Sequence, residues 1–348
     1  MARGNIVTSR SLWRLEFFVV SLLFHLIFTW SIFDVYFHSP VVYPSRRFDA
    51  ANAVPDAPWT GDAPADRLVL IVADGLRADT LFQRHATASL PSWAQHAVQG
   101  DQLVYNGTYP DAFKRTKTVD WQVSGPLYSY AAPYLRSIAR GPGVFGVSHT
   151  RVPTESRPGH VALIAGMYED MSAVTKGWKI NPLAFDSLVN QSSHSYAYGS
   201  PDIVPMFVLG TSPDKVDWQV YNEEAEDFTK DAVELDTWVL HRMRDVFARA
   251  QRDPKADARL RQPKTLFFMH LLGLDTTGHT YRPMSPEYVG NTIVVDEIVR
   301  QVSHLFEDFY GDNKTAFLVT ADHGMSRKGN HGDGDPDNTR TPLVAWGA

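Results

Sequence analysis

The sequence predicts an α/β fold, in which a mostly parallel central sheet has helices on both faces and is preceded by one transmembrane helix. Short, continuous apolar runs at 67–73, 265–270 and 315–320 are typical of strands that are buried on both faces of a parallel sheet. Amphipathic stretches between such runs predict the helices that cover the sheet. An uncharged apolar segment at 17–33 comes first and predicts the membrane helix.

The apolar segment near the N-terminus predicts a membrane anchor rather than a cleaved signal peptide. Leu12 and Trp13 extend it to roughly the length that spans a bilayer, and the sequence after it lacks a small-x-small cleavage site. Arg3, Arg10 and Arg14 precede it. The positive-inside rule therefore puts the N-terminus in the cytosol and the rest of the chain across the membrane.

The remaining sequence predicts a linker followed by one lumenal domain. Pro, Ala and Asp are frequent in the linker, and bulky apolar residues are few. Three sequons for N-glycosylation fit a glycoprotein that faces the lumen, at Asn106, Asn190 and Asn313. The expected parts are residues 1–37 for the cytosolic tail and anchor, 38–66 for the linker and 67–348 for the lumenal catalytic domain.

Weaker patterns fill in the sheet and its helices. Apolar runs at 195–198, 216–221 and 343–346 predict further strands, and residues 228–251 have an imperfect helical pattern. The helix at 285–309 is clearer. An apolar stripe runs along it. Ser285 can cap it, Pro286 fits its first position, and Gly311 lies just past its end.

The composition excludes several classes of function. A net charge of -6, with no stretch dominated by Lys and Arg, argues against a nucleic-acid-binding surface. The chain has no cysteine, which excludes disulfides, thiolate nucleophiles and cysteine-ligated metals. Any metal site must therefore be built from His, Asp and Glu.

Acidic and histidine residues follow the predicted strands at their carboxyl ends, where the chemistry of open α/β sheets gathers. Taken singly, each could be a turn former, a helix cap or a hydrogen-bonded scaffold residue. Together they supply three carboxylates and three imidazoles, enough for two divalent ions, with zinc favoured and manganese the alternative. This composition predicts a two-metal phosphoryl-transfer site. The candidate metal ligands are Asp74, Asp275, His279, Asp322, His323 and His331.

A serine provides the candidate nucleophile. Ser156 comes just before the predicted helix at 160–166, so its hydroxyl would lie at a helix N-terminus, where free N–H groups attract phosphate. Activation by the metals would let it attack at neutral pH. The simpler interpretation is that Ser156 only caps the helix, and Thr154 is the alternative nucleophile.

The order of these motifs resembles that of phosphodiesterases of the nucleotide pyrophosphatase type in the alkaline phosphatase superfamily. The resemblance implies an alkaline phosphatase-like fold. One metal would be held by Asp275, His279 and His331, and the other by Asp74, Asp322 and His323, with the Ser156 oxygen at or between them. That subfamily usually has Thr where this chain has Ser156, and the longer interval from Asp74 to Ser156 implies an insertion.

Longer strings of sequence are similar to the GPI ethanolamine phosphate transferases. The resemblance implies transfer of phosphoethanolamine from phosphatidylethanolamine to the first mannose of the GPI-mannolipid precursor, at the endoplasmic reticulum membrane. Members of that family also have a long multi-span C-terminal region, so we expect this chain to be an N-terminal fragment. The strings are 33–42, 74–80, 148–160, 177–182, 185–187 and 274–279.

Five further residues are candidates for substrate binding, although ordinary surface or core roles are at least as common for such residues. Basic groups would bind phosphate or carbohydrate, and a tryptophan could contact the ethanolamine head through a cation–π interaction. These candidates are Arg157, Lys176, Trp178, Lys179 and Asp202. The sequence does not predict a protein partner.

Two other functions remain open on the same scaffold. A phosphodiesterase would use water as the second acceptor, and the motif residues do not separate it from a transferase. A membrane-anchored lumenal binding protein that lost the chemistry is the second alternative. The presence of all six candidate ligands and Ser156 argues against it.

Overall fold

The structure is a computed structural model, and it describes residues 5–36, 63–86, 98–99, 102–103, 128–166, 168, 187–209, 211–226 and 232–348. Contacts divide the chain into two units. The smaller unit contains the N-terminal helix, and the larger unit contains the α/β domain. Most of the predicted linker lies outside the described residues, and the boundaries predicted at 37 and 66 stay predictions.

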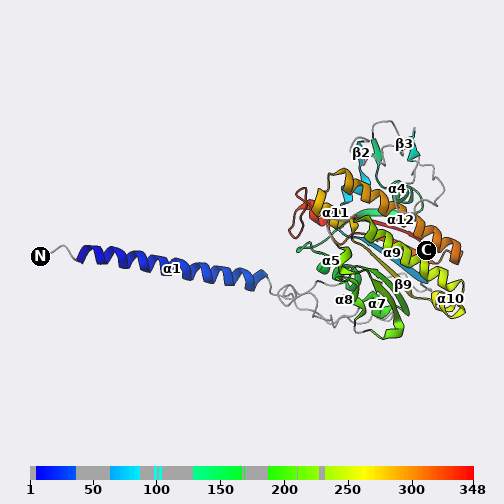
Figure 1. The fold of residues 1–348 in the computed structure, drawn as a ribbon, viewed down its shortest axis with the longest axis horizontal. Coiled ribbons are helices and arrows are strands. Elements are labelled where there is room, and N and C mark those ends of the chain that lie inside the picture. Colours follow the sequence, from blue (N-terminus) through cyan, green and yellow to red (C-terminus); the bar gives the residue numbers. More distant parts are fainter. Residues whose placement is uncertain are drawn as a thin grey trace, which may run out of the picture. The chain divides into compact units, whose positions relative to one another are not determined.

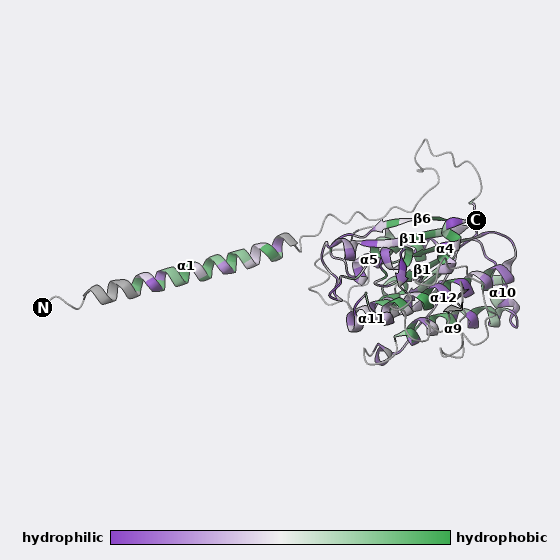
Figure 2. Ribbon diagram, turned by 90° about the horizontal axis from the view of Figure 1, so that it is seen from above, coloured by the Kyte–Doolittle hydropathy of each residue, from purple (hydrophilic) through white to green (hydrophobic). Residues whose placement is uncertain are grey.

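Helix α1 (Asn5–Tyr36) contains the apolar segment near the N-terminus. Its span from Leu12 to Asp34 is long and apolar enough to cross a membrane, and within the described part of the chain it is the one helix with these properties. Large apolar side chains such as Phe17, Phe24 and Phe28 are exposed along it, and hydrophobic residues cover most of its length (Figure 2). This helix has the properties expected of a membrane anchor.

Seven strands form the central sheet, in the order β6-β11-β10-β1-β9-β7-β8. Strands β1, β7, β8, β9 and β10 run parallel, and β11 runs antiparallel to both of its neighbours. The predicted mostly parallel sheet is therefore confirmed. The strands are β1 (Arg67–Ala73), β6 (Val144–His149), β7 (His194–Gly199), β8 (Val216–Val220), β9 (Thr265–Leu271), β10 (Thr315–Thr320) and β11 (Arg340–Gly347).

Alternating side chains of the sheet build two hydrophobic cores, one on each face. On β1, Val69 and Ile71 belong to the core that contains helices α9 and α12, whereas Leu70 and Val72 belong to the core that contains α5 and α8. Figure 1 shows α9 and α12 on one side of the strands and α7 and α8 on the other. The first face carries α4 (Pro133–Arg140), α9 (Val233–Ala250), α10 (Pro254–Leu260) and α12 (Pro286–Tyr310); the second carries α5 (Ser156–Ala165), α7 (Leu188–Gln191) and α8 (Val204–Val208).

The remaining elements are short connections between the layers. Two small antiparallel sheets pair β2 with β5 and β3 with β4. Helix α11 follows β9 directly and carries two of the predicted ligands. The bounds are β2 (Arg84–Ala86), β3 (Val98–Gln99), β4 (Gln102–Leu103), β5 (Tyr128–Tyr130), α2 (Ala78–Phe82), α11 (Gly273–Tyr281), α13 (Pro336–Thr339) and 3-10 turns at Pro213–Lys215 and Glu223–Ala225.

The caps predicted for the long helix α12 are present. The Ser285 hydroxyl accepts a hydrogen bond from the Tyr288 N–H at 3.1 Å, and Gly311 ends the helix in the left-handed region with φ of 59°. The strands predicted at 67–73 and 315–320 have the predicted bounds, and the one predicted at 265–270 is one residue longer.

Candidate active site

Three of the predicted ligands meet where two neighbouring strands end. Asp74 follows β1, and Asp322 and His323 follow β10; these strands pair in parallel, with Val72 opposite Thr320. The His323 Nε2 atom lies 3.3 Å from Asp74 Oδ1 and 3.5 Å from Asp322 Oδ2, and all three side chains are buried. Their ligand atoms are close enough together to hold one metal ion.

The other three predicted ligands form a second group. Asp275 and His279 were expected at a strand end, but they lie four residues apart on α11, which places both on one face of the helix. His331 joins them from the loop after β10. Its Nε2 atom lies 3.5 Å from Asp275 Oδ1 and 3.1 Å from His279 Nε2, and His279 Nε2 lies 3.4 Å from Asp275 Oδ2.

The two groups adjoin one another. The rings of His323 and His331 stack with their centroids 4.0 Å apart, and Asp275 contributes to the electrostatic field at Asp74. The structure thus brings all six predicted side chains together. Their role as metal ligands stays a prediction.

Ser156 is the first residue of α5, and its hydroxyl faces the first group. The Ser156 Oγ atom lies 3.4 Å from Asp74 Oδ1 and 3.3 Å from His323 Nε2. The N-cap of this helix is Glu155, so the interpretation of Ser156 as only a helix cap is wrong. Pro158 has no backbone N–H, whereas Ser156 and Arg157 before it in the first turn of α5 each have one.

Thr154, the alternative nucleophile, has its hydroxyl engaged in the fold. The Thr154 Oγ1 atom donates to the carbonyl of Asp333 at 2.7 Å and accepts from the N–H of Gly332 at 2.8 Å. The residue is fully buried. Thr154 therefore holds the loop that carries His331, while Ser156 has the hydroxyl that faces the candidate ligands.

Each of the three candidate imidazole ligands is oriented by a backbone carbonyl. The Nδ1 atom of His279 lies 2.9 Å from the carbonyl of Gly329. The corresponding distances are 2.8 Å from His331 to Thr154 and 2.8 Å from His323 to its neighbour Gly324. A carbonyl can only accept, so each Nδ1 donates to it and Nε2 is the ring nitrogen that faces the cluster.

The buried charges shift the pKa values within the cluster. Burial, together with the negative charges of Asp322 and Asp275, raises the pKa of Asp74 well above its ordinary value. Burial acts the same way on Asp275, but the His279 hydrogen bond and the nearby imidazoles outweigh it and lower the pKa of that carboxyl. The hydrogen bond to the Asp275 carboxylate raises the pKa of His279, whereas burial lowers that of His331.

Three residues of the site were not among the predicted ones. His270, on β9, lies 2.9 Å from Asp74 through its Nε2 atom. His160 on α5 contacts the Ser156 carbonyl at 2.7 Å and Asp322 at 3.4 Å, and Glu155 lies 3.4 Å from His331. The sequence did contain a signal for His270. A histidine near the carboxyl end of a buried strand lies at the same edge of the sheet as the candidate ligands.

The predicted substrate-binding residues have different positions. Arg157 is buried on α5. Asp202 is exposed in the turn after β7, where its N–H donates to the Ser200 hydroxyl at 3.1 Å. Lys176, Trp178 and Lys179 lie outside the described residues. No contact described for these five tests a role in substrate binding.

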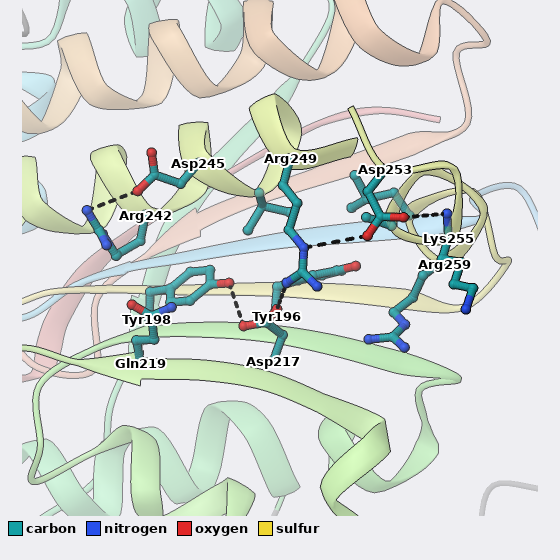
Figure 3. Close-up of a pocket in the computed structure, with 13 residues that line it drawn as sticks. Tyr196, Tyr198, Asp217, Gln219, Arg242, Asp245, Arg249, Asp253, Lys255 and Arg259 are labelled. Atoms are coloured by element: carbon teal, nitrogen blue, oxygen red, sulfur yellow. Dashed lines mark hydrogen bonds and ion pairs between the residues drawn. The ribbon is translucent and has the colours of Figure 1, made fainter. Parts of the chain in front are cut away.

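A separate cavity of about 210 Å³ lies between β7, β8, α9 and α10 (Figure 3). Acidic and basic side chains of its wall pair with one another, such as Arg242 with Asp245 at 2.9 Å. The Tyr198 hydroxyl donates to Asp217 at 3.2 Å in the same wall. None of the six candidate ligands lines this cavity.

Comparisons with known proteins show which sequences and structures this chain resembles. The sequence profile described as "Type I phosphodiesterase / nucleotide pyrophosphatase" matches residues 126–332. The chain is 52% identical over 335 residues to GPI ethanolamine phosphate transferase 1 of Aspergillus oryzae, covering 96% of this chain and 30% of the relative. It is 46% identical over 336 residues to the protein of that name from Saccharomyces cerevisiae, covering 96% and 32%.

The chain therefore spans about a third of the length of these relatives.

Among solved structures, the integral membrane protein lipooligosaccharide phosphoethanolamine transferase A from Neisseria meningitidis is similar, with a TM-score of 0.43 and 12% identity over 82% of this chain and 48% of that one. The family match, together with the mostly parallel sheet covered on both faces, confirms the predicted fold class.

Proposed function

This chain belongs to the type I phosphodiesterase / nucleotide pyrophosphatase family, and we propose that it provides the two-metal active site of a membrane-anchored phosphoethanolamine transferase of GPI-anchor biosynthesis. The observation that carries the proposal is the meeting of six metal-ligand side chains beside one serine hydroxyl. Ser156 Oγ lies 3.4 Å from Asp74 and 3.3 Å from His323, both members of the first group.

The arrangement of the two outer histidines supports a cation at the second group. Because the Nδ1 atoms of His279 and His331 donate to carbonyls, a neutral ring at either position has its lone pair at Nε2. These two Nε2 atoms face each other at 3.1 Å. Two neutral rings with lone pairs this close would be stabilised by a positive charge beside both nitrogens, which a divalent ion would provide.

The carboxylates support the same conclusion. Asp275 Oδ1 and Asp322 Oδ2 are buried oxygens without a hydrogen-bond partner among the described residues, and each belongs to one of the two groups. Buried carboxylate oxygens are costly unless paired or bound to metal. A donor set of imidazoles and carboxylates suits zinc first and manganese second. Two divalent ions held there would neutralise charge on a phosphoryl group and lower the pKa of a nearby hydroxyl.

The first half of the proposed reaction takes place at Ser156. The Ser156 oxygen attacks the phosphorus of phosphatidylethanolamine, a new P–O bond forms, and the bond from phosphorus to the diacylglycerol oxygen breaks. Diacylglycerol leaves with the proton that the serine lost. Phosphoethanolamine is then esterified to Ser156. The N–H groups at the start of α5 stabilise the negative charge on the phosphoryl oxygens during this step.

The second half returns the serine to its starting state. A hydroxyl of the first mannose of the GPI-mannolipid attacks the same phosphorus from the side that diacylglycerol left. The bond from phosphorus to the Ser156 oxygen breaks, and the serine takes up the proton of the acceptor hydroxyl. A ping-pong reaction of this kind needs both lipids at one site in turn, which a membrane-tethered domain favours.

We place the reaction at the lumenal face of the endoplasmic reticulum membrane. The apolar helix α1 supports the membrane location. Arg3, Arg10 and Arg14, on the N-terminal side of the apolar segment at 17–33, support an orientation with the α/β domain in the lumen.

The test is transfer of labelled phosphoethanolamine by the full chain in detergent micelles, with Zn²⁺, phosphatidylethanolamine and a mannoside acceptor. We expect the label on Ser156 when the acceptor is omitted and on the mannoside when it is added. Ser156→Ala should lower turnover by roughly a thousandfold or more, because the attacking oxygen is gone. Ser156→Thr should keep part of the activity, since it retains a hydroxyl.

Metal content is the control for this experiment. Ser156→Ala should bind as much zinc as the unchanged chain, because Ser156 is not one of the six ligands. Label that reaches only water would support the phosphodiesterase alternative. Full turnover by Ser156→Ala would contradict the proposed nucleophile.

A further inference from the structure

The two oxygens of the Asp74 carboxylate have different neighbours. Oδ1 lies 3.4 Å from Ser156 Oγ and 3.3 Å from His323 Nε2, on the side of the proposed reaction. Oδ2 lies 2.9 Å from His270 Nε2, on the side of the core. Both side chains are fully buried. The contact with His270 therefore bears on how the Asp74 carboxylate is oriented toward the nucleophile.

The pairing of β1 with β9 sets this contact. His270 lies opposite Val72 in the parallel register, and Asp74 is two residues beyond Val72, so it projects to the same face of the sheet. The Asp74 N–H continues the ladder by donating to the Leu271 carbonyl at 2.8 Å. Backbone pairing thus holds the His270 ring and the Asp74 carboxylate side by side.

A third strand determines which nitrogen of His270 carries the proton. The Ser200 N–H, just after β7, donates to His270 Nδ1 at 3.3 Å. An N–H group can only donate, so Nδ1 is the acceptor and Nε2 carries the hydrogen. The turn approaches closely because Gly199 has no side chain. A Cβ there would lie 2.5 Å from His270 Cβ.

We propose that His270 is a positioning residue, which donates its Nε2 hydrogen to Asp74 Oδ2 and thereby keeps Oδ1 directed at Ser156 and His323. The ring itself is held edge-on by His160, with centroids 4.7 Å apart. This inference rests on the proposed function in one respect, namely that Asp74 is a metal ligand. Hydrogen bonds of this kind orient ligands in metal sites, and their loss typically weakens metal binding by about 10–100-fold.

The alternative is that His270 binds a third metal ion. Asp74, His160 and His270 also have ligand atoms within 4.8 Å of one another. A metal on His270 Nε2 would require the proton to lie on Nδ1, where it would face the Ser200 N–H. The hydrogen-bonding arrangement therefore favours the positioning role over the third metal.

The experiment combines substitutions with a direct measurement of the proton. His270→Leu removes the donor, and His270→Gln keeps an N–H at the end of a side chain of similar reach. His194→Leu is the matched control, because His194 is also a buried histidine but lies opposite Thr265, at the other end of the sheet. Zinc titration of the full chain gives the affinity of each site, and ¹⁵N NMR of the zinc-loaded chain reports which nitrogen of His270 is protonated.

We expect zinc affinity at one site to fall about 10–100-fold in His270→Leu, to recover at least in part in His270→Gln, and to stay unchanged in His194→Leu. NMR should show a neutral His270 with its proton on Nε2. Three bound zinc ions, or metal on Nε2, would overturn the inference in favour of the third metal site. Unchanged affinity in a folded His270→Leu chain would overturn it in favour of a purely structural histidine.

These readouts do not depend on the transferase reaction. If the unchanged chain binds zinc but transfers no phosphoethanolamine, the proposed function fails while the titration and the NMR still decide the role of His270.

Discussion

Gly159 shows how closely the nucleophile helix packs against the metal-ligand residues. A Cβ at this position would lie 2.8 Å from the Asp322 carbonyl oxygen and 2.9 Å from the Asp322 Cβ. Only a glycine lets α5 approach Asp322 to this distance. Since Ser156 begins the same helix, the position of its hydroxyl depends on this contact.

We predict that Gly159→Ala has a larger effect on turnover than on thermal stability. The added methyl group pushes α5 away from Asp322, and a displacement of about 1 Å at a reacting group can cost roughly a hundredfold in rate. Steady-state kinetics and thermal unfolding of the same preparation measure the two effects. Gly146→Ala is the control, because a Cβ there has nothing within 4 Å. Equal turnover in both variants would contradict the prediction.

At the residue scale, the sequence predicted which candidate ligands would meet better than it predicted the residues that orient them. The six candidate ligands and Ser156 could be proposed because they stand in a fixed order after recognisable strands. His270 was missed because its partner depends on the register of β1 against β9, which no local pattern specifies. The hydrogen bonds of the Thr154 hydroxyl are likewise made to residues far away in the sequence.

At the scale of elements, two buried side chains join segments that are distant in the sequence. Asp296 on α12 accepts the N–H groups of Tyr134 and Leu135, both at 2.8 Å, and so caps the start of α4. Arg77 contacts Asp79, Asp337 and the Met325 carbonyl, and so ties the start of α2 to the loop that carries His331. Each contact predicts a measurable effect.

Asp296 should make stability depend on pH. Burial raises the pKa of Asp296 to about 8, although the two N–H groups act to lower it. Between the ordinary value of 3.8 and about 8, the folded chain therefore binds more protons at this group than the unfolded chain. The contribution of Asp296 to the free energy of unfolding falls as pH rises through this window, by at most about 1.4 kcal/mol per pH unit.

We predict that Asp296→Asn removes this dependence. The unfolding free energy of the unchanged chain minus that of the variant should fall steadily from pH 5 to pH 7, as measured by denaturant unfolding in detergent micelles. Asp308→Asn, at an exposed position on the same helix, controls for the change in net charge. A difference that grows with pH would show that the ionised form of Asp296 stabilises the fold.

Arg77→Lys should destabilise the loop that carries His331. The Arg77 guanidinium bonds both oxygens of Asp79, at 2.8 and 2.6 Å, and reaches Asp337 at 3.0 Å. A lysine cannot reproduce this fork, so we expect a loss of roughly 1–3 kcal/mol in unfolding free energy and weaker zinc binding at the His331 group. Arg327→Lys, an exposed position in the same loop, is the control. Equal stability of the two variants would contradict the prediction.

The elements themselves were predicted unevenly. Helix α12 could be predicted because its caps and apolar stripe are local features. The direction of β11 could not, because a short apolar run looks the same in parallel and antiparallel pairs. The start of α5 at Ser156 was also missed, since Pro158 and Gly159 are poor residues for a helix interior and concealed its first turn.

At the scale of the whole molecule, the candidate anchor α1 and the α/β domain have apolar residues that suit different surroundings. Helix α1 has apolar residues around its circumference, which suits lipid, whereas the domain buries its apolar residues against its own sheet. The proposed lipid substrates give a reason for the two to be joined in one chain.

We predict that a single charge in the middle of α1 impairs membrane insertion. Leu23 lies at the centre of the span Leu12–Asp34, and an arginine there costs about 3 kcal/mol of insertion free energy. Expression with microsomes followed by alkaline extraction measures the membrane-bound fraction. That fraction should fall for Leu23→Arg and stay high for Leu23→Ala; full retention of the arginine variant would argue against a spanning helix.

The most direct measurement of the central claim is anomalous X-ray scattering from crystals of the zinc-loaded chain, collected on both sides of the zinc absorption edge. The structure predicts two peaks beside Ser156. One should lie among Asp74, Asp322 and His323, and the other among Asp275, His279 and His331. Peaks elsewhere, or no peak at either group in a chain that transfers phosphoethanolamine, would contradict the two-metal account.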